Sequence, residues 1–322
     1  MKYLVTGGAG FIGSNIAHGL LDRGESVRII DNFSTGKRAN IADIEDKVEL
    51  IDGDIRDFWV VREAVEGVDY ILHQAALPSV PRSIKNPLSC NQVNIDGTLN
   101  LLECARQASI KRFVMASSSS VYGDTPELPK HEDMPTNPLS PYAVTKLTCE
   151  KYCRLYFDLY GLETVCLRYF NIFGPRQDPQ SEYAAVIPKF IKAFLKGKQP
   201  VVYGDGEQSR DFTYITNAVA SNLLATQAPA APGKYYNIAC GSQFTLNQML
   251  DILRGIIDID IQAQYTPPRK GDIVHSFANI DRARAELDYD PDVKFEDGLR
   301  KTVEWFVKQM HNDTPVSGIK FG

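Results

Sequence analysis

The sequence TGGAGFIG, residues 6–13, follows an apolar run over residues 2–6 and leads into a helix-like segment over residues 12–23. Glycines at positions 7, 10 and 13 permit a tight turn, a close approach of the backbone to a pyrophosphate, and close packing of a helix on a strand. The first turn of the helix offers free N–H groups and a positive dipole end to phosphates. Three glycines alone would fit an ordinary tight turn, but this strand–turn–helix context predicts a dinucleotide-binding site.

A second apolar run, over residues 26–31, ends in Asp31. At this offset from the glycines an acidic residue accepts hydrogen bonds from the adenosine ribose of a dinucleotide. A carboxylate here repels the additional phosphate of NADP, so the sequence favours NAD as cofactor. Lys37 and Arg38 lie close by in the sequence and keep NADP open as an alternative.

Length and composition describe an ordinary globular chain: 322 residues, of which 43% are hydrophobic and 23% charged. The net charge of −5 gives no reason to expect nucleic acid or an anionic membrane as a partner. No apolar run is long enough to span a bilayer. The first apolar stretch is too short and too glycine-interrupted for a signal peptide.

Six cysteines lie in apolar or helix-like segments. Cys149 and Cys153 are one helical turn apart, a spacing that could supply half of a metal site. No histidine or further cysteine lies near them, so we expect buried thiols and no metal. This use of cysteine predicts a reducing, cytoplasmic location.

Apolar runs alternate with helix-like segments up to about residue 170. We expect strands over 2–6, 26–31, 48–52, 69–73, 111–117 and 163–168, and helices over 12–23, 57–66, 89–108 and 141–160. This alternation predicts right-handed βαβ units and a doubly wound parallel sheet, the Rossmann fold. Prolines and glycines become frequent after residue 168. We therefore expect a dinucleotide-binding domain over 1–170 and a smaller α/β substrate lobe over 171–322, with some segments returning to the first domain.

Tyr142 and Lys146 lie four residues apart in the expected helix over 141–160 and share one of its faces. Ser140 suits the N-cap of that helix and Pro141 its first turn. A lysine ammonium beside a phenol favours the phenolate, lowering a pKa that is normally about 10 toward that of a general base. The preceding strand ends in four serines, 117–120, whose hydroxyls can meet the tyrosine across a cofactor. This combination predicts a catalytic centre, although Tyr and Lys at this spacing also occur on ordinary helix surfaces.

The chain resembles the extended short-chain dehydrogenases/reductases over essentially its whole length, and among them the UDP-sugar 4-epimerases. The resemblance is carried by GGAGFIG at 7–13, DN at 31–32, GDI at 53–55, HQAA at 73–76, SSSVYG at 118–123, YAVTK at 142–146 and LRYFN at 167–171. Together these motifs are specific for the family.

The resemblance implies that Asp54 and Ile55 flank the adenine of NAD, that Asn94 lies near the cofactor, and that Phe170 lies by the nicotinamide. The cofactor site that it implies comprises Gly7, Gly10, Phe11, Ile12, Gly13, Asp31, Asn32, Ser34, Thr35, Gly36, Asp54, Ile55, Gln74, Ala75, Ala76, Asn94, Tyr142, Lys146 and Phe170.

The implied reaction is a reversible oxidation at carbon 4 of the sugar. By resemblance, Tyr142 as phenolate takes the proton of the 4-hydroxyl, Ser118 donates or relays a hydrogen bond, and Lys146 holds the nicotinamide ribose. The 4-keto sugar turns over in the pocket and receives the hydride on its other face. Because every hydride is returned, NAD is expected to stay bound between turnovers.

The serine run separates this chain from related enzymes. Related sugar-nucleotide dehydratases carry Asp-Glu just after the catalytic hydroxyl, and related decarboxylases and GDP-mannose dehydratases keep a Glu there, whereas this chain has Ser119 and Ser120. Elimination of water needs an acid and a base near carbons 5 and 6. The absence of these two carboxylates therefore favours simple epimerisation.

The resemblance also implies a UDP-sugar site. Arginine suits a diphosphate because it forms bidentate, charge-assisted hydrogen bonds. In the implied site Arg210, Arg269 and Asp272 hold the UDP. The site comprises Ser79, Ser118, Ser119, Tyr142, Asn171, Gln177, Ala185, Val186, Tyr203, Arg210, Arg269, Asp272 and Ser276.

Ser276 discriminates best between sugars, because it occupies the family's gate position seven residues after Arg269. By resemblance, a tyrosine there restricts an enzyme to glucose and galactose, and a small residue admits a 2-N-acetyl group. The segment over 174–188 also resembles the N-acetyl-handling subgroup, whereas Pro78 departs from the glycine or lysine of many relatives. We therefore expect conversion of UDP-N-acetylglucosamine to UDP-N-acetylgalactosamine, with UDP-glucose and UDP-galactose as an additional pair.

Two alternatives stay open. The nearest enzyme is a UDP-glucuronate 4-epimerase, since members of that group also carry serine runs before Val-Tyr-Gly. A regulator that senses nucleotides on the same fold is the alternative from another class, although intact Ser118, Tyr142 and Lys146 oppose it. Family members pair the helices that correspond to 89–108 and 141–160 across a two-fold axis, so we expect a homodimer. Apolar residues at helical spacing in 141–160, including Tyr152, Leu155, Tyr156 and Leu159, usually face the core.

Overall fold

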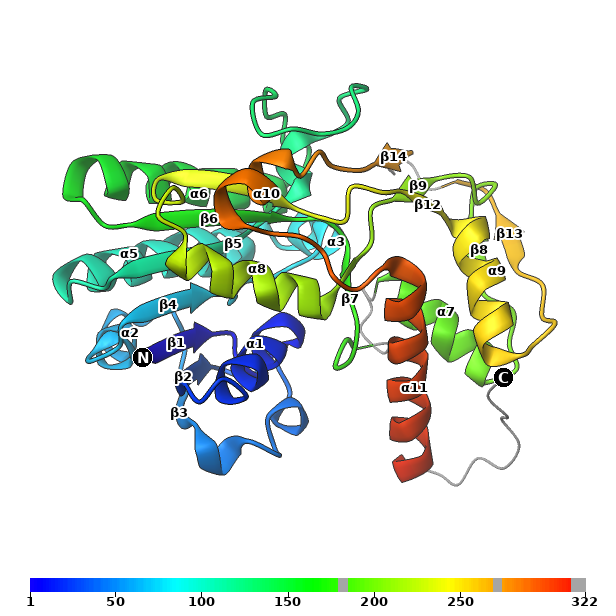
Figure 1. The fold of residues 1–322 in the computed structure, drawn as a ribbon, viewed down its shortest axis with the longest axis horizontal. Coiled ribbons are helices and arrows are strands. Elements are labelled where there is room, and N and C mark those ends of the chain that lie inside the picture. Colours follow the sequence, from blue (N-terminus) through cyan, green and yellow to red (C-terminus); the bar gives the residue numbers. More distant parts are fainter. Residues whose placement is uncertain (179–184, 269–273, 314–322) are drawn as a thin grey trace.

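The computed structural model describes residues 1–178, 185–268 and 274–313. A seven-stranded parallel sheet lies on one side of the molecule and a smaller group of helices on the other (Figure 1). We call the sheet with its covering helices the sheet unit, and the smaller group with its short strands the lobe.

The central sheet confirms the predicted doubly wound fold. Its strand order is β11-β6-β5-β4-β1-β2-β3, and all neighbours are parallel. All six predicted strands form, and their observed bounds are β1 (Lys2–Thr6), β2 (Ser26–Asp31), β3 (Glu49–Asp52), β4 (Tyr70–His73), β5 (Arg112–Ser118) and β6 (Thr164–Tyr169). The seventh strand, β11 (Lys234–Ile238), comes from the second half of the chain. The chain reverses its direction of winding between β1 and β4, where folds of this class bind their ligands.

Helices cover both faces of the sheet. One face packs against α1 (Phe11–Leu21), α8 (Ile215–Gln227) and α10 (Asp281–Leu287). The opposite face packs against α2 (Phe58–Val65), α5 (Gly97–Gln107) and α6 (Pro141–Tyr160). Strands that are buried on both faces have continuous apolar sequences. This explains why the apolar runs predicted the positions of the strands well.

The start and end of helix α6 follow from its sequence. The Ser140 hydroxyl accepts the N–H of Ala143 at 3.2 Å, and Pro141 stands in the first turn. Gly161 ends the helix in the left-handed conformation, with φ of +69°. The predicted helix therefore begins and ends where expected.

The predicted helix over 89–108 forms, but it contains a π-helical turn that was not predicted. Helix α4 (Pro87–Asn91) runs into a π-helical turn over Gln92–Asp96, and α5 follows from Gly97. The carbonyl of Asn94 accepts the Thr98 hydroxyl at 2.5 Å and the Cys149 thiol at 3.1 Å. These side-chain bonds compete for the carbonyl that a regular helix would use, and a wider turn results.

The lobe is built from three helices and pairs of short strands. Helices α7 (Val186–Leu195), α9 (Leu246–Ile257) and α11 (Phe295–Asp313) pack on one another around their own apolar core. The strand pairs are β7 (Ile172–Phe173) with β10 (Thr213–Tyr214), β8 (Val201–Tyr203) with β13 (Gln264–Thr266), and β9 (Ser209–Arg210) between β12 (Phe244–Thr245) and β14 (His275–Ser276). Because α8, α10 and β11 belong to the sheet unit, the second half of the chain serves both units.

The prediction that Cys149 and Cys153 are buried thiols is confirmed. All six thiols are free, and five of them are buried. Within the described residues, no helix combines the length and the apolar character that crossing a membrane requires.

Candidate active site

The glycine-rich turn between β1 and α1 leaves no room for side chains. Gly7 has a φ of +66°, and a Cβ on it would lie 2.8 Å from the Cα of Ala75. A Cβ on Gly13 would overlap the carbonyl oxygen of Gly7. Helix α1 begins at Phe11 without a side-chain cap, so the N–H groups of its first turn lack partners within the helix. This close-packed turn with exposed donors fits the pyrophosphate of a dinucleotide.

Asp31, at the end of β2, is bound to the same turn. Its Oδ2 accepts the N–H of Ala9 at 2.9 Å, and its Oδ1 accepts the N–H of Phe33 at 2.8 Å. Burial raises the pKa of Asp31, while the bonds from Phe33 and Ala9 act in the opposite direction. Each carboxylate oxygen keeps a further lone pair for a ribose hydroxyl. Asp31 therefore has a second role that the sequence analysis missed, the fixing of the glycine turn against β2.

The two basic residues near Asp31 are paired with carboxylates. Lys37 Nζ lies 2.9 Å from Asp178 Oδ2. Arg38 contacts Glu45 Oε1 at 3.2 Å and Asp52 Oδ2 at 2.8 Å. This pairing favours NAD over NADP, because both cations already have anionic partners.

The predicted adenine-binding residues gather after β2 and β3. Asn32 Nδ2 donates to Asp54 Oδ2 at 2.7 Å, and hydrogen bonding from Arg56 lowers the pKa of Asp54 to about 2. Ile55 is buried, and a Cβ on Gly97 would overlap its side chain. Three further predicted residues, Ser34, Thr35 and Gly36, lie in the loop that follows β2.

Gln74, Ala75 and Ala76 follow the end of β4, as the motif predicts. The N–H of Ala75 donates to Thr6 Oγ1 at 3.1 Å, which joins this segment to the glycine turn. Gln74 Nε2 donates to Asn222 Oδ1 at 3.0 Å. The ends of β1 and β4 therefore form one surface at the switch point of the sheet.

Asn94 and Phe170 are buried within the protein. Asn94 Oδ1 accepts the N–H of Leu77 at 2.8 Å, and its Nδ2 donates to Thr145 Oγ1 at 3.0 Å. Phe170 is fully buried, with its ring centroid 6.3 Å from that of Tyr122. Both residues therefore pack within the protein beside the predicted cofactor site.

Ser118, Tyr142 and Lys146 come together where β5 meets α6. Ser118 hydrogen-bonds to the Tyr142 phenol. Lys146 Nζ donates to the carbonyl of Ala116 at 2.7 Å and lies 5.9 Å from the centroid of the Tyr142 ring. The three predicted catalytic side chains therefore occupy one site, with the lysine next to the tyrosine.

The pKa of Tyr142 differs from the sequence expectation. Burial raises it to about 12, although the hydrogen bond from Ser118 lowers it. The Lys146 ammonium was expected to lower this pKa. It lies instead against a backbone carbonyl, and burial lowers its own pKa. In the protein alone, the loss of hydration around the phenol outweighs the hydrogen bond from Ser118.

His73 is a buried neighbour of this site to which the sequence analysis gave no role. Its ring nitrogens lie 2.7 Å from Thr6 Oγ1 and 2.9 Å from Thr98 Oγ1. Burial, and then the charge of Lys146, lower its pKa to about 3. His73 is therefore a neutral residue that links β1, β4 and α5 beneath the cofactor site. Its only sequence signal was its place in the HQAA motif.

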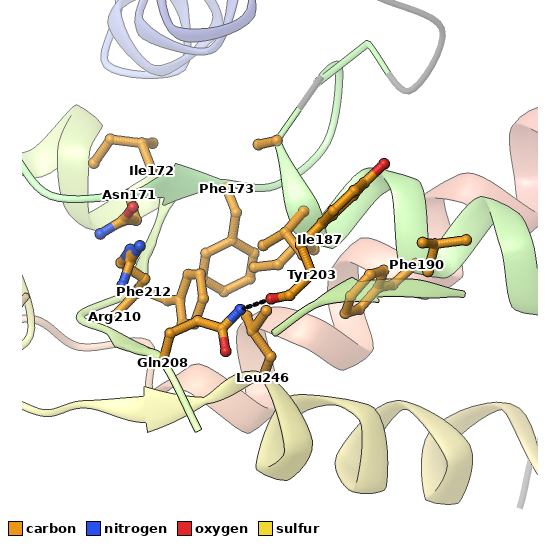
Figure 2. A pocket seen from close by; sticks show the side chains of 13 residues that line it. Asn171, Ile172, Phe173, Ile187, Phe190, Tyr203, Gln208, Arg210, Phe212 and Leu246 are labelled. Atoms are coloured by element: carbon orange, nitrogen blue, oxygen red, sulfur yellow. Dashed lines mark hydrogen bonds between the residues drawn. The ribbon is translucent and has the colours of Figure 1, made fainter. Parts of the chain in front are cut away.

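A cavity of about 270 Å³ lies in the lobe and brings together five predicted substrate residues. Arg210 and Asn171 stand at one end, and Phe190 lies toward the other (Figure 2). The amide of Gln208 donates to the carbonyl of Tyr203 at 2.6 Å. The cavity is lined by Asn171, Ile172, Phe173, Ala185, Val186, Ile187, Phe190, Val201, Tyr203, Gln208, Arg210, Phe212 and Leu246. Its apolar and aromatic walls with one arginine suit a nucleoside diphosphate.

Part of the apolar wall of this cavity was not predicted. Phe173 lies in β7, Phe212 between β9 and β10, and Leu246 in α9. In the sequence, these three residues resemble ordinary core residues. The sequence analysis marked this cavity only through the five substrate residues that the family resemblance implied.

Ser276, which was predicted to lie near the substrate, lies beside Arg210. The two residues are paired between the parallel strands β14 and β9. The Ser276 carbonyl accepts the N–H of Asp211 at 2.8 Å, which fixes the strand against the arginine.

The remaining predicted substrate residues are more scattered. Ser79 begins helix α3 (Val80–Lys85), where its hydroxyl accepts the N–H of Arg82 at 3.4 Å. Gln177 Nε2 donates to the carbonyl of Ile172 at 3.2 Å. Ser119 follows Ser118 at the end of β5. Arg269 and Asp272 lie outside the described residues.

The sequence matches the model of the NAD dependent epimerase/dehydratase family over residues 3–239. The chain belongs to this family, and its cofactor is NAD. The resemblance found in the motifs, the Rossmann fold and the choice of cofactor are confirmed.

Three similar proteins illustrate the range of the family. A UDP-N-acetylglucosamine 4-epimerase from Methanobrevibacter ruminantium, solved in complex with UDP-N-acetylmuramic acid, is 44% identical with a TM-score of 0.92, covering 96% of this chain and 99% of that one. A putative UDP-glucose 4-epimerase from Methanocaldococcus jannaschii is 39% identical over 94% of this chain and 97% of its own length. A UDP-glucuronic acid 4-epimerase from Bacillus cereus, solved with UDP-glucuronic acid and NAD, is 33% identical with a TM-score of 0.89, covering 96% of this chain and 100% of that one.

Proposed function

We propose that this protein is a UDP-sugar 4-epimerase that interconverts UDP-N-acetylglucosamine and UDP-N-acetylgalactosamine, and also UDP-glucose and UDP-galactose, through a 4-keto intermediate. The observation that carries the choice of sugar is Ser276, a small residue paired with Arg210 of the cavity. A small side chain at this position leaves space for a 2-N-acetyl group. The 44% identity to a UDP-N-acetylglucosamine 4-epimerase supports the same choice.

Bound NAD supplies a hydride acceptor and a positive charge on its oxidised ring. Tyr142 accepts the proton of the sugar 4-hydroxyl and later returns it. Its raised pKa keeps the phenol protonated in the protein alone, so a nearby positive charge is needed to make it a base. Ser118 is already hydrogen-bonded to Tyr142 and orients the same hydroxyl. Lys146 lies next to Tyr142 and holds the ribose of the cofactor.

The residues after Ser118 favour epimerisation over elimination. Ser119 and Ser120 occupy the 3-10 turn (Ser119–Tyr122) that follows β5, and the Ser120 hydroxyl is buried without a hydrogen-bond partner among the described residues. Neither side chain can act as the carboxylic acid or the carboxylate base that loss of water requires.

A uronic acid substrate is the second candidate, because relatives with that activity are 33% and 35% identical to this chain. A carboxylate at carbon 6 calls for a further cation or several donors close to the sugar. Among the described residues that line the cavity, Arg210 is the only cation, and we assign it to the diphosphate. This assignment favours a neutral sugar.

A substrate panel with product analysis tests the proposal. Wild-type protein should convert both UDP-N-acetylglucosamine and UDP-glucose, and should leave UDP-glucuronate unchanged. Conversion of UDP-glucose without UDP-N-acetylglucosamine would show that our interpretation of Ser276 is wrong. No turnover on any UDP-sugar would favour a nucleotide sensor.

The substitution Ser276→Tyr sharpens this test. The bulky ring should block turnover of the N-acetylated sugar and leave turnover of UDP-glucose intact. The ratio of kcat/KM for UDP-N-acetylglucosamine to kcat/KM for UDP-glucose should therefore fall by roughly tenfold or more. Ser276→Ala is the matched control and should keep both activities. Equal losses of activity on both sugars in the tyrosine variant would contradict the hypothesis that residue 276 controls which sugar is accepted.

We also propose a homodimer. Apolar side chains along α6 are exposed, contrary to the expectation that the whole stripe faces the core: Tyr156 is buried, but Leu155 and Leu159 are 47% and 67% exposed. Leu88 on the adjacent helix α4 is 76% exposed. Such a row of apolar residues is suited to a second copy of the same helices. Light scattering on the purified protein should give twice the chain mass, and Leu159→Asp should reduce it.

A cytoplasmic location completes the proposal. It is supported by six free thiols and by a cofactor that cells keep in that compartment. Cell fractionation tests it, and recovery of the protein outside the cytoplasm would contradict it.

A further inference from the structure

Three consecutive residues at the end of strand β5 each bond to helix α6. The carbonyl of Ala116 accepts from Lys146 at 2.7 Å. The hydroxyl of Ser117 donates to Glu150 Oε1 at 2.5 Å. Ser118 bonds to Tyr142. Two of these contacts belong to the predicted catalytic residues, and the contact between Ser117 and Glu150 has no place in the proposed chemistry.

Glu150 also bonds to Arg168 on the neighbouring strand β6. The guanidinium donates through Nε to Oε1 at 2.8 Å and through Nη2 to Oε2 at 2.7 Å. Both side chains are only 2% exposed. Arg168 is paired with Ser117 between β6 and β5, so one carboxylate joins the helix to both strands.

Aromatic rings hold the arginine in place. Its Cζ lies 4.0 Å from the centroid of Tyr235 and 4.8 Å from that of Tyr122. The remaining nitrogen, Nη1, has no hydrogen-bond partner within the described part of the chain. An arginine held between rings and by a two-point bond can occupy few positions. The Glu150 carboxylate is therefore held in one place.

Stability alone is a weak reason for such a pair. Burying two charges costs several kcal/mol of hydration each, and a well-packed apolar pair of similar volume is often as stable. The position of the pair indicates another role. Tyr142, Lys146 and Glu150 are spaced by four residues and lie on one face of α6. Fixing Glu150 therefore sets how far α6 can rotate or slide along β5.

We propose that Glu150 and Arg168 are positioning residues, which hold the Tyr142 phenol and the Lys146 ammonium in register with Ser118. The carboxylate bonds to β5 and β6 one helical turn beyond Lys146, and so sets the distance between proton acceptor and sugar hydroxyl. This inference rests on the proposed epimerase function. Turnover of a UDP-sugar by wild-type protein is therefore established first, since its absence would reject the proposed function and not the positioning role.

The test is Glu150→Gln in the full-length protein loaded with NAD. The amide keeps the size of the side chain but loses the two-point, charge-assisted bond. We expect kcat to fall by roughly 100-fold, the loss expected for a misplacement of about 1 Å, with KM and bound NAD unchanged. Unchanged kcat would overturn the inference, and so would a loss of kcat accompanied by equal losses in UDP-sugar and NAD binding.

Glu163→Gln is the matched control. Glu163 pairs with Arg112, at 2.6 Å, at the opposite end of the same strand β5, and its side chain is 44% exposed where that of Glu150 is 2% exposed. Its loss removes an Arg–Glu pair from the sheet without touching α6 near the active site. We expect kcat within twofold of wild type, and a fall that matches Glu150→Gln would overturn the inference.

A double variant separates positioning from stability. Glu150→Gln with Arg168→Met removes the unpaired buried charge, so the melting temperature should recover toward wild type. A kcat that stays low supports positioning, and a kcat that recovers with the melting temperature overturns it.

A milder variant decides the case if Glu150→Gln does not fold. Ser117→Ala removes one hydroxyl bond to Glu150 and should lower kcat by roughly tenfold with KM unchanged. Ser221→Ala, a buried serine whose bond lies within α8, is its control. Equal kcat values in the two serine variants would overturn the inference.

Discussion

The sheet unit takes its predicted catalytic residues from one strand and the next helix, whereas the lobe takes its cavity from many short elements. Ser118, Tyr142 and Lys146 all lie where β5 meets α6. The cavity instead joins residues from Asn171 to Leu246 through β7, α7, β8, β9 and α9. In the sheet unit the predicted catalytic side chains are closely packed. In the lobe the predicted substrate residues line an apolar cavity that contains one arginine. Chemistry and choice of substrate are therefore separable by mutation.

The largest effect is expected at the glycine turn. The Cβ of Gly13→Ala would overlap the carbonyl oxygen of Gly7, so the turn must open and lose its fit to a pyrophosphate. Purified variant should contain no NAD when its nucleotide content is measured after denaturation. Gly255→Ala is the control, because a Cβ there meets nothing within 4 Å. Full occupancy by NAD in the Gly13 variant would show that this turn does not form the cofactor site.

Tyr142→Phe tests the chemistry of the sheet unit alone. The variant keeps the buried ring but removes the proton acceptor, so kcat should fall by about 10³-fold with little change in KM. Steady-state rates on the best UDP-sugar measure this. Unchanged turnover would remove Tyr142 from the mechanism.

Arg210→Ala tests the lobe alone. Loss of a charge-assisted bond to a diphosphate should raise KM by about 10- to 100-fold and change kcat much less. Arg284→Ala, which removes a half-exposed arginine of α10, should leave both constants unchanged. If Arg210→Ala lowered kcat as strongly as Tyr142→Phe, the separation between the two regions would not hold.

The last prediction concerns stability and pH, and its effect is the smallest when taken over a single pH unit. The pKa of His73 is lowered to about 3 by burial and by the charge of Lys146, so between pH 6.5 and 3 the unfolded chain binds a proton that the folded protein does not. The free energy of unfolding should therefore decrease as the pH is lowered through this window. This residue contributes at most about 1.4 kcal/mol per pH unit to that decrease. Denaturant titrations at several pH values should show a shallower slope for His73→Gln. The same slope in that variant and in the control His131→Gln would contradict the assignment.

Local patterns predicted the sheet unit well because its strands are buried on both faces and its helices carry strong end signals. Ser140, Pro141 and Gly161 mark α6 in the sequence, and they mark it in the structure. The interruption between α4 and α5 was missed. It depends on bonds from Thr98 and Cys149 to one carbonyl, and no periodicity records such bonds.

The lobe was predicted only in outline. Arg210, Tyr203 and Ser276 were placed near the substrate through motifs, whereas the apolar walls that complete the cavity read as ordinary core. The pKa of Tyr142 was predicted in the wrong direction, because spacing along a helix reveals a neighbouring charge but not the loss of water around it.

The sequence by itself determined the fold class and the preference for NAD, and it predicted the dinucleotide turn and a catalytic tyrosine and lysine. Each of these depends on residues that are close in the chain and whose local conformations are strongly constrained. Only the tertiary structure showed the cavity, the neutral His73 and the bonds from Glu150 to Ser117 and Arg168. These features depend on packing between distant segments and on the water that this packing excludes, neither of which leaves a periodic mark in the sequence.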